Sequence, residues 1–351
     1  MIKITPNSKL CIWGSTPEVK TGGAEVIQLL ASTLKRLGVN CGVFNWSMPM
    51  YEQSEYFKQY YDINCWTWEE VQDDENVIIF LPESMVEISD NLKWFVENFK
   101  HAQFMIWWLS IANVQMEERF TSTRRIISRL KHIKDRSLNL CESDVIMNDL
   151  KHYGLNNVLR LSHGVHESFY NLPQLCPKQN SVMYSGIKPD IADYVENKLI
   201  PIMPDVYFDK LEWSSTNYKT KEDMCRMFDR NKVYIDFAEF TGREMMPREA
   251  ALRNCALLVA NRCCSTSFED YPIPNEYKVD IYGDPEPIAD KIRFLLNNYN
   301  TEIEKFKFFK NKCLGEPLRW MSNIQTVFGN MISKININYI NDGHTVSYSC
   351  I

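Results

Sequence analysis

A carboxylate and a guanidinium stand side by side at Glu249 and Arg248, in the part of the sequence best suited to binding chemistry. Val233–Phe237 upstream reads as a strand, and Pro247 is predicted at the first position of the next helix, where its fixed φ and missing N–H are tolerated. Arg248 and Glu249 then fall in the first helical turn. Open α/β sheets bind ligands beyond the carboxyl ends of their strands, so this turn is the first candidate site.

The side chains of this segment suit a nucleotide. Glu249 could accept hydrogen bonds from both hydroxyls of a ribose, because a carboxylate offers several acceptor positions. The N–H groups of the helix start and the side chain of Arg243 could hold a diphosphate. Glu244 adjoins Arg243 and is grouped with it as a candidate catalytic residue. An ordinary helix start is the other interpretation of Pro247–Glu249.

A second basic side chain follows an earlier predicted strand, Val182–Tyr184. The loop after this strand contains Ser185 and Lys188, and the lysine could reach a diphosphate as a point charge. A solvated lysine in a turn is the other interpretation. We add Ser185 and Lys188 to the candidate anion site.

Two glycines, Gly22 and Gly23, lie between a predicted strand at Leu10–Trp13 and an amphipathic helical pattern. Glycines let the backbone approach a ligand closely, and a helix start supplies N–H groups and a partial positive charge. Their spacing fits neither GxGxxG nor GxxxxGK[ST], which argues against a dinucleotide dehydrogenase and a P-loop NTPase. A plain strand-to-helix turn is the alternative.

These candidates need a framework of strands and helices. Short apolar runs alternate with longer amphipathic stretches along the chain, which predicts an α/β fold with parallel sheets built from βαβ units. The strands predicted from the apolar runs are Leu10–Trp13, Val43–Trp46, Val77–Leu81, Phe104–Leu109, Val182–Tyr184, Val233–Phe237 and Leu257–Val259.

The length of 351 residues is sufficient for two domains. The weakly periodic segment His163–Lys178 is the predicted linker. We expect an N-terminal domain over residues 1–172, a second domain over residues 173–315, and a helical tail over residues 316–351 that packs back toward the first domain.

The composition narrows the function classes. A formal net charge of −6 excludes a generally basic, nucleic-acid-binding surface. The 11 cysteines contain no CxxC pair, which favours a reduced cytosol over a disulfide framework. The apolar run around Met105–Leu109 is shorter than the roughly 18–20 residues that a bilayer requires. The sequence contains no Asp-x-Asp, which argues against a substrate held by a divalent metal. We therefore expect neither a metal nor a cofactor.

Two motifs resemble those of glycosyltransferases with the GT-B fold, especially the large retaining family four. They are T-G-G-A-E-V at residues 21–26 and P-R-E-A-A at residues 247–251. The resemblance implies two facing Rossmann-like domains, with Gly22 and Gly23 at the cleft and Glu249 on the nucleotide ribose. The first glutamate of the family's Glu-x7-Glu motif would fall at position 241, where this chain has Thr241.

Further motifs are similar to a branch of these enzymes found in bacterial polysaccharide clusters. They are G-R-E-M-M-P-R-E-A-A at 242–251, F-E-D-Y-P-I-P at 268–274, W-W-L-S at 107–110 and P-E at 82–83. The resemblance places Glu83, Trp108, Ser110 and Asn113 on the acceptor side. Of the two adjacent tryptophans, we expect one in the core and the other at the cleft.

The resemblance implies transfer of a sugar from a nucleotide-sugar donor to a hydroxyl of a glycan or lipid-linked acceptor, in polysaccharide biosynthesis. Arg243, Lys188 and the helix amides would stabilise the departing diphosphate, and retention of configuration is implied by the family alone. Thr241 keeps open a catalytically weak, glycosyltransferase-like binding partner. A nucleotide-sugar epimerase is a third possibility.

A basic amphipathic pattern covers residues 119–136. Such a helix could lie on an anionic membrane or hold a lipid diphosphate, which would make a cytoplasmic protein peripheral to the membrane. A solvated helix face is the other interpretation.

Overall fold

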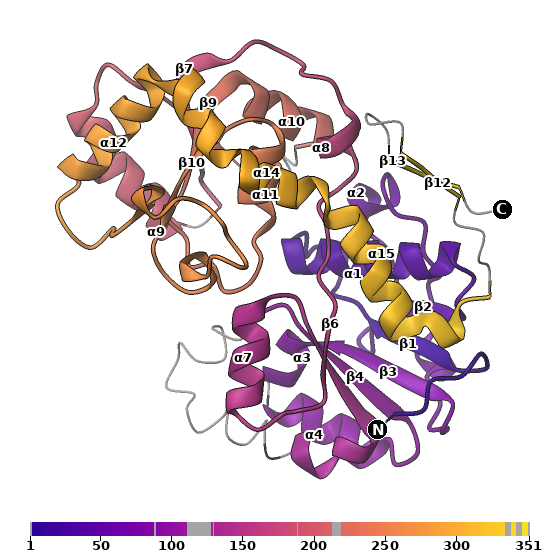
Figure 1. The fold of residues 1–351 in the computed structure, drawn as a ribbon. Coiled ribbons are helices and arrows are strands. Elements are labelled where there is room, and N and C mark those ends of the chain that lie inside the picture. Colours follow the sequence, from indigo (N-terminus) through magenta and orange to yellow (C-terminus); the bar gives the residue numbers. More distant parts are fainter. Residues whose placement is uncertain are drawn as a thin grey trace. The chain divides into compact units, whose positions relative to one another are not determined.

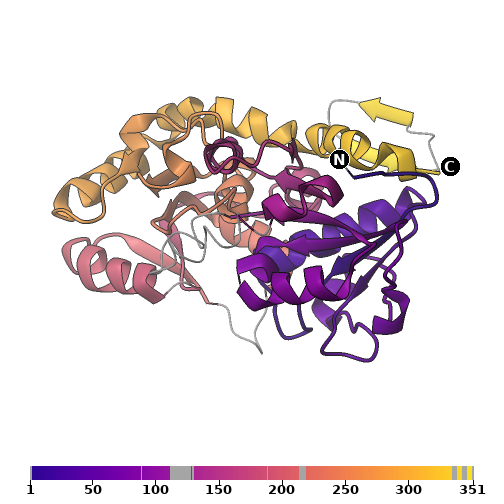
Figure 2. The ribbon, with the colours of Figure 1, turned by 90° about the horizontal axis from the view of Figure 1, so that it is seen from below.

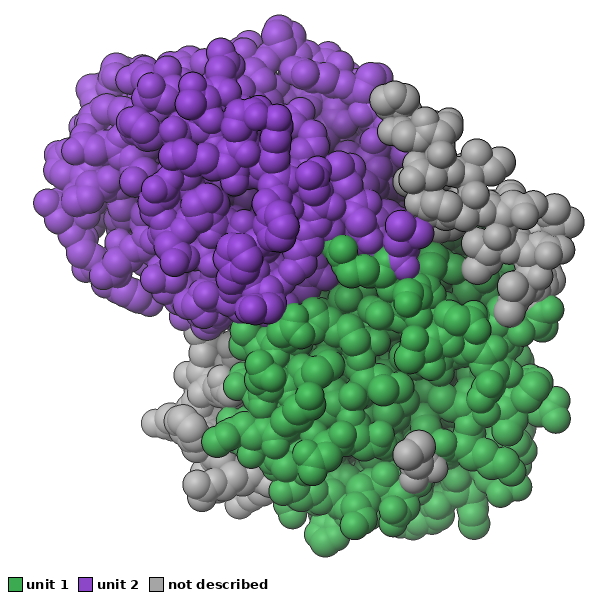
Figure 3. Space-filling model, in the orientation of Figure 1, with its two compact units in different colours: residues 1–163, 319–341, 346–351 green, residues 164–318, 342–345 purple. Residues whose placement is uncertain are grey.

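The computed structural model describes residues 2–87, 89–110, 128, 130–187, 189–212, 219–333, 338–341 and 346–349. The described residues form two compact units, coloured separately in Figure 3. Unit 1 comprises residues 1–163, 319–341 and 346–351, and unit 2 contains residues 164–318. The chain thus changes units at 163/164 and 318/319, whereas the sequence predicted boundaries at 172/173 and 315/316.

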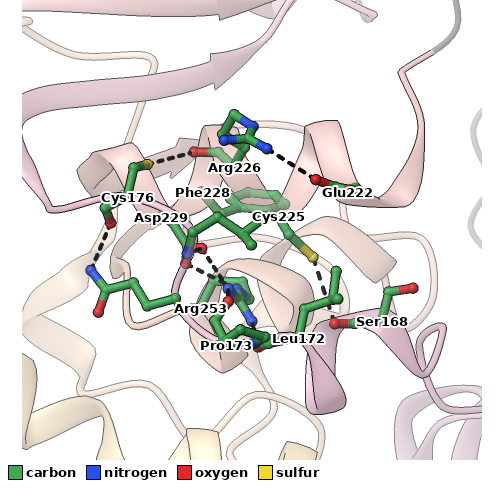
Figure 4. A network of polar contacts seen from close by, with 12 residues as sticks. Ser168, Leu172, Pro173, Cys176, Glu222, Cys225, Arg226, Phe228, Asp229 and Arg253 are labelled. Atoms are coloured by element: carbon green, nitrogen blue, oxygen red, sulfur yellow. Dashed lines mark hydrogen bonds and ion pairs between the residues drawn. The ribbon is translucent and has the colours of Figure 1, made fainter.

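The first crossing precedes the predicted boundary because the linker packs on unit 2 (Figure 4). Arg253 donates to the carbonyl oxygens of Leu172 at 2.6 Å and Pro173 at 2.7 Å. The same guanidinium pairs with the buried carboxylate of Asp229, which also accepts from the backbone N–H of Leu175 at 2.8 Å. One buried ion pair therefore holds the linker against unit 2.

The sheet of unit 1 is parallel throughout, with strand order β2-β1-β3-β4-β5-β6 (Figure 1). Every residue of the two central strands, β3 and β4, is buried, as expected for a parallel sheet with helices on both faces. The strands are β1 Lys9–Trp13, β2 Cys41–Phe44, β3 Val77–Pro82, β4 Gln103–Trp108, β5 Ser137–Cys141 and β6 Val158–Arg160.

Helices cover both faces of this sheet. One hydrophobic cluster joins alternate residues of β4, including Phe104 and Trp108, to Phe95 of α4 and Ile146 of α7. The intervening residue Trp107 points to the opposite face, because side chains alternate along a strand. The helices of this part of the chain are α1 Gly22–Arg36, α2 Glu55–Lys58, α3 Glu83–Glu87, α4 Ser89–Asn98 and α7 Asp144–His152.

The sheet of unit 2 is also parallel, with strand order β11-β10-β9-β7-β8. From β7 the chain moves to β8 on one side and returns to β9 on the other. The carboxyl ends of β7 and β9 therefore flank a topological switch point, where open α/β sheets bind ligands. The strands are β7 Gln179–Ser185, β8 Tyr207–Leu211, β9 Asn231–Asp236, β10 Ala256–Ala260 and β11 Lys278–Val279.

The helices of unit 2 follow its strands in the order expected for βαβ units. They are α8 Ser168–Asn171, α9 Pro189–Tyr194, α10 Lys221–Arg230, α11 Met245–Leu252, α12 Glu286–Asn297, α13 Tyr299–Glu302 and α14 Lys307–Leu314. A π-helical turn at Val195–Leu199 extends α9. Short 3-10 turns occur at Trp68–Glu70, Lys134–Arg136, Ile200–Ile202, Cys264–Thr266, Asn275–Tyr277, Ile303–Phe306 and Gly329–Met331.

The last helix, α15 (Glu316–Phe328), contains the second crossing and returns the chain to unit 1. Within unit 1, the ring of Trp320 stacks on that of Trp107 with centroids 6.2 Å apart, and Phe328 contacts Phe80. Figures 1 and 2 both show the yellow end of this helix beside the indigo elements of unit 1. A short hairpin follows, formed by β12 Asn338–Asn341 and β13 Val346–Ser349.

Candidate functional site

The candidate turn of unit 2 lies at the start of α11, directly after β9. The helix begins at Met245, two residues before the predicted start, so Pro247 is its third residue. This position tolerates proline because the first four N–H groups of a helix have no intrahelical partner. Arg248 and Glu249 follow and are buried, with exposures of 0% and 4%.

Both candidate arginines contact one carboxylate, that of Glu316 at the start of α15. Arg248 Nη1 lies 3.0 Å from Glu316 Oε2, and Arg243 Nη2 donates to Glu316 Oε1. Arg248 also donates to the backbone oxygens of Glu244 at 3.0 Å and Arg243 at 2.7 Å. The carboxylate, which is 1% exposed, therefore fixes both guanidinium groups beside the start of α11.

The linker adds a phenol to this cluster. Tyr170 Oη donates to Glu316 Oε2 at 3.4 Å. Burial, and secondly the charge of Glu316, holds the pKa of Tyr170 well above its usual range. The phenol therefore remains a proton donor to the carboxylate at any ordinary pH.

Glu249 lies among α11, α10 and β9. Burial is the main cause of the raised pKa values of Tyr234 on β9 and Cys225 on α10, and the charge of Glu249 contributes to both. Tyr234 donates to the carboxylate of Asp236 at 2.9 Å, and Asp236 accepts from the N–H of Ala238 at 3.1 Å. Two buried carboxylates, Asp236 and Glu249, thus belong to the carboxyl end of β9 and the helix after it.

The loops after β9 and β10 run side by side and share an ion pair that the sequence did not predict. Phe240 and Cys263 form a parallel bridge between these loops. Arg262 Nη1 lies 3.2 Å from Glu239 Oε1 and 2.7 Å from the hydroxyl of Tyr282. Cys263 has φ of 52°, a left-handed conformation that is strained for a side chain of this type. Glu239 and Arg262 are 23 residues apart in the sequence, so no short-range pattern linked them.

The other side of the switch point is the end of β7. Ser185 Oγ accepts from the N–H of Ile187 at 3.3 Å. A Cβ atom at Gly186 would lie 2.6 Å from Lys210 Cε and 2.9 Å from the carbonyl oxygen of Leu211, so only glycine fits. Lys210 pairs with Glu196 at 2.7 Å, and this contact raises the pKa of the lysine. Lys188 lies outside the described residues.

In unit 1, Gly22 and Gly23 are exposed and are the first two residues of α1. Thr21 caps the helix, its side chain accepting from the N–H of Ala24 at 3.4 Å. A Cβ atom at Gly23 would meet only Leu109, at 3.8 Å. The helix start is thus open to solvent.

The residues predicted for the acceptor side follow β3 and β4. Glu83 accepts from the N–H of Leu109 at 3.2 Å and so joins the ends of these two strands. Glu83 and Ser110 are buried, and Asn113 lies outside the described residues, as does most of the basic segment 119–136. These contacts tie the acceptor-side candidates to the scaffold of the sheet.

Trp108 differs from its expected position. Its exposure is 1%, it belongs to the core cluster with α4, and its Nε1 donates to Asn139 Oδ1 at 3.0 Å. Trp107 is also buried, under Trp320 of α15. Both rings are core residues because helices cover both faces of β4, so we correct the expectation that Trp108 is open to a ligand.

A buried pair lies after β5 and β6. His163 Nε2 is 2.7 Å from Glu142 Oε2, and the histidine ring packs edge-on against Trp107. His166 instead contacts Ser168 Oγ at 2.9 Å. His163, the first residue of the predicted linker, is thus held by a carboxylate of unit 1.

Among the described residues, no group of three or more His, Cys, Asp or Glu side chains is arranged to hold a metal ion. Within the same ranges, no helix has the length and apolar character needed to cross a membrane.

No family model and no curated protein matches this sequence, whereas many solved structures match its fold. TarM of S. aureus, solved as a mutant with UDP, gives a TM-score of 0.54 at 14% identity; the match covers 76% of this chain and 57% of TarM. HepE of Anabaena, in complex with UDP-glucose, gives 0.61 at 10% identity, covering 92% and 99%. The trehalose-6-phosphate synthase OtsA gives 0.57 at 11% identity, covering 92% and 99%.

This chain therefore spans a little over half of TarM and almost all of HepE and OtsA. The likeness is one of fold. The chain has two parallel-sheet α/β units of the GT-B type and a helical C-terminal region, as the sequence predicted.

Proposed function

We propose that this protein is a glycosyltransferase that moves a sugar from a nucleotide-sugar donor to a hydroxyl of a glycan or lipid-linked acceptor. The observation that carries the proposal is the position of Glu249 and the start of α11, directly after β9 at the switch point of unit 2. Three neighbours in fold support it, since their solved structures hold UDP, UDP-glucose or UDP-2-fluoro glucose.

In this proposal Glu249 accepts hydrogen bonds from the ribose. The N–H groups at the start of α11, together with Ser185 and the backbone at Gly186, bind the diphosphate. Lys188, which follows β7 in the sequence, would add a point charge.

The chemical demand of the reaction is to stabilise the diphosphate as its bond to the sugar breaks. Preorganised charges meet this demand best, because they need no reorganisation during the reaction. Arg243 and Arg248 are held by Glu316 in fixed orientations, which is the preorganisation required. Glu244, the residue immediately before α11, is partly exposed and completes the proposed group.

We propose further that the reaction needs no divalent metal and serves polysaccharide biosynthesis in the cytoplasm. The first point rests on the lack of an Asp-x-Asp sequence, and the second on the motif order described above. Contact of residues 119–136 with an anionic membrane surface belongs to the same proposal. Excess EDTA should leave the transfer rate unchanged, and a loss that added Mg²⁺ restores would overturn metal independence.

Calorimetric titration with UDP and GDP tests the donor site. Heat of binding is expected with at least one of them, and no heat with any nucleoside diphosphate would overturn the proposal. Incubation with a panel of nucleotide sugars then tests transfer, because UDP or GDP should be released rapidly only after an acceptor is added.

A second candidate function is favoured by Thr241. Its position corresponds to a glutamate in the family motif. Its backbone N–H donates to the backbone carbonyl oxygen of Glu239 at 2.9 Å. A protein of this fold without that glutamate could bind a nucleotide sugar and hold a partner glycan without turnover. Nucleotide binding without release of diphosphate, across the donor and acceptor panels, would favour this candidate.

A further inference from the structure

Unit 1 contains a hollow of about 400 Å³ beyond the carboxyl ends of β1 and β2. It is lined by Pro17, by residues 51–55 at the approach to α2, and by Lys58 and Cys65. Small-molecule sites commonly have volumes of about 300–1,000 Å³. The hollow is thus large enough for one or two sugar rings.

Its inner wall is a buried network of neutral polar groups. Gln28 of α1 donates to the hydroxyl of Tyr51 at 2.9 Å. Gln53 donates to Gln28 Oε1 at 3.0 Å and to the carbonyl oxygen of Tyr61 at 2.8 Å. Gln28, Tyr51 and Gln53 are each at least nine-tenths buried. The network fixes Tyr51 and Gln53 in the wall, because each is held by α1.

Hydrogen-bonding capacity remains on these two side chains. Both amide protons of Gln53 are used, whereas its side-chain oxygen accepts no hydrogen bond from any described residue. Tyr51 accepts from Gln28, and burial raises the pKa of its phenol to about 12, so it keeps its proton. A hydroxyl-rich ligand could donate to Gln53 and accept from Tyr51.

The charges at the rim oppose an anionic ligand. Glu52, Glu55 and Lys58 are exposed, and Lys58 Nζ pairs with Glu55 Oε1 at 2.5 Å. Two carboxylates and one ammonium give the rim a formal charge of −1, and the ammonium is already paired. A phosphorylated sugar would meet repulsion here, whereas an uncharged one would not.

We propose that this hollow binds an uncharged saccharide, with its hydroxyls on Gln53, Tyr51 and Glu52 and a C–H face of the ring on Pro17 and Tyr51. Sites of this kind combine apolar walls with a few fixed polar groups. Binding of the saccharide stands on this geometry alone. Its role as the acceptor of transfer rests on the proposed function.

Saturation-transfer NMR on the full chain tests the binding. The probes are methyl glycosides of glucose, galactose and N-acetylglucosamine, with glucose 6-phosphate as the charged comparison. We expect saturation transfer to at least one neutral glycoside, and a saturation-transfer signal at least fivefold weaker for glucose 6-phosphate. No transfer to any neutral glycoside, or equal transfer to the phosphate, would overturn the proposal.

A filling variant locates the site. Glu52→Trp places an indole at the rim of the hollow and should reduce glycoside binding at least fivefold. Glu69→Trp is the matched control, since Glu69 is also exposed in unit 1 but does not line the hollow. Equal binding by the two variants would overturn the assignment.

Calorimetry with UDP separates this inference from the proposed function. Glu52→Trp should bind UDP as the wild type does. Glycoside binding without any nucleotide binding would remove the transferase proposal and leave the saccharide site. Nucleotide binding without glycoside binding would remove the saccharide site and leave the transferase proposal.

Discussion

The carboxyl edges of the two sheets have the same architecture but differ in the polar networks beside α11 and α1. In unit 2 the groups beside α11 are charged and paired, with Arg243 and Arg248 on Glu316. In unit 1, Gln28 of α1 joins two neutral side chains, Tyr51 and Gln53. A buried carboxylate, Glu25, adjoins this network and accepts from the hydroxyl of Tyr61 at 2.7 Å. A buried charged network suits an anionic ligand, whereas a neutral one suits a ligand that only donates and accepts hydrogen bonds.

Under the two proposals, this difference assigns the nucleotide sugar to unit 2 and the saccharide to unit 1. The strand-to-helix turn supplies N–H groups in both units. In the proposed division, side chains further along select the ligand: an arginine cluster in unit 2, and Gln53 with Tyr51 in unit 1. This division predicts that substitutions in one network leave ligand binding by the other unchanged.

The largest effect is expected from Glu316→Ala. It removes the carboxylate that compensates two buried guanidinium groups, which should lower the free energy of unfolding by about 3–5 kcal/mol. Urea denaturation measures the change. Glu97→Ala is the control, because Glu97 lies 3.9 Å from Lys93 on an exposed helix face and should contribute less than about 1 kcal/mol. Similar losses in both variants would contradict the role of the buried cluster.

Glu249→Ala should have the next largest effect, on ligand binding. Loss of hydrogen bonds to a charged group costs about 1.5–3 kcal/mol, which corresponds to tenfold or greater weakening of UDP binding. Calorimetry on the folded variant provides the measurement. Glu269→Ala, at an exposed glutamate of the same unit, should bind UDP as the wild type does. Unchanged affinity in Glu249→Ala would remove this residue from the site.

Gln28→Leu tests the neutral network. The substitution leaves Tyr51 and Gln53 without their shared partner, and it should lower the free energy of unfolding by about 1–3 kcal/mol. The loss should be smaller than for Glu316→Ala, because no charge is left buried. UDP affinity should stay the same, and a tenfold change in it would break the division between the units.

The smallest expected effect is on alkaline stability. Burial raises the pKa of Tyr51 from its ordinary value of 10.0 to about 12. The folded state therefore keeps this proton where the unfolded state has lost it, so the contribution is complete below pH 10 and is lost as the pH rises through about 12. Tyr51→Phe should flatten the fall in unfolding free energy between these pH values. An unchanged slope would show that Tyr51 is not the group responsible.

Most of the strand framework follows from the sequence, because continuous apolar runs are typical of buried parallel strands. The runs at Val77–Leu81 and Phe104–Leu109 correspond to β3 and β4 within one residue at each end. β5 was missed because its sequence, SLNLC, contains a buried asparagine. Asn139 accepts a hydrogen bond from Trp108, a contact that hydrophobic periodicity cannot predict.

The residues of the candidate site were likewise predictable only in part. Short-range patterns indicated Glu249 and the exposed glycines of α1, since both depend on residues close in sequence. Glu316 could not be found, because it lies 68 residues from Arg248 and meets it only through tertiary packing. The burial of Trp107 likewise depends on α15, which returns to unit 1 from the far end of the chain.

That return has a consequence for synthesis. A ribosome completes residues 1–163 and then all of unit 2 before it delivers the segment from Arg319 that covers Trp107 and Phe80. During this interval the nascent chain presents the apolar area around Trp107 and Phe80 without the helix that covers it, which is the condition that attracts chaperones and favours aggregation. Expression of residues 1–163 alone would make this exposed face permanent.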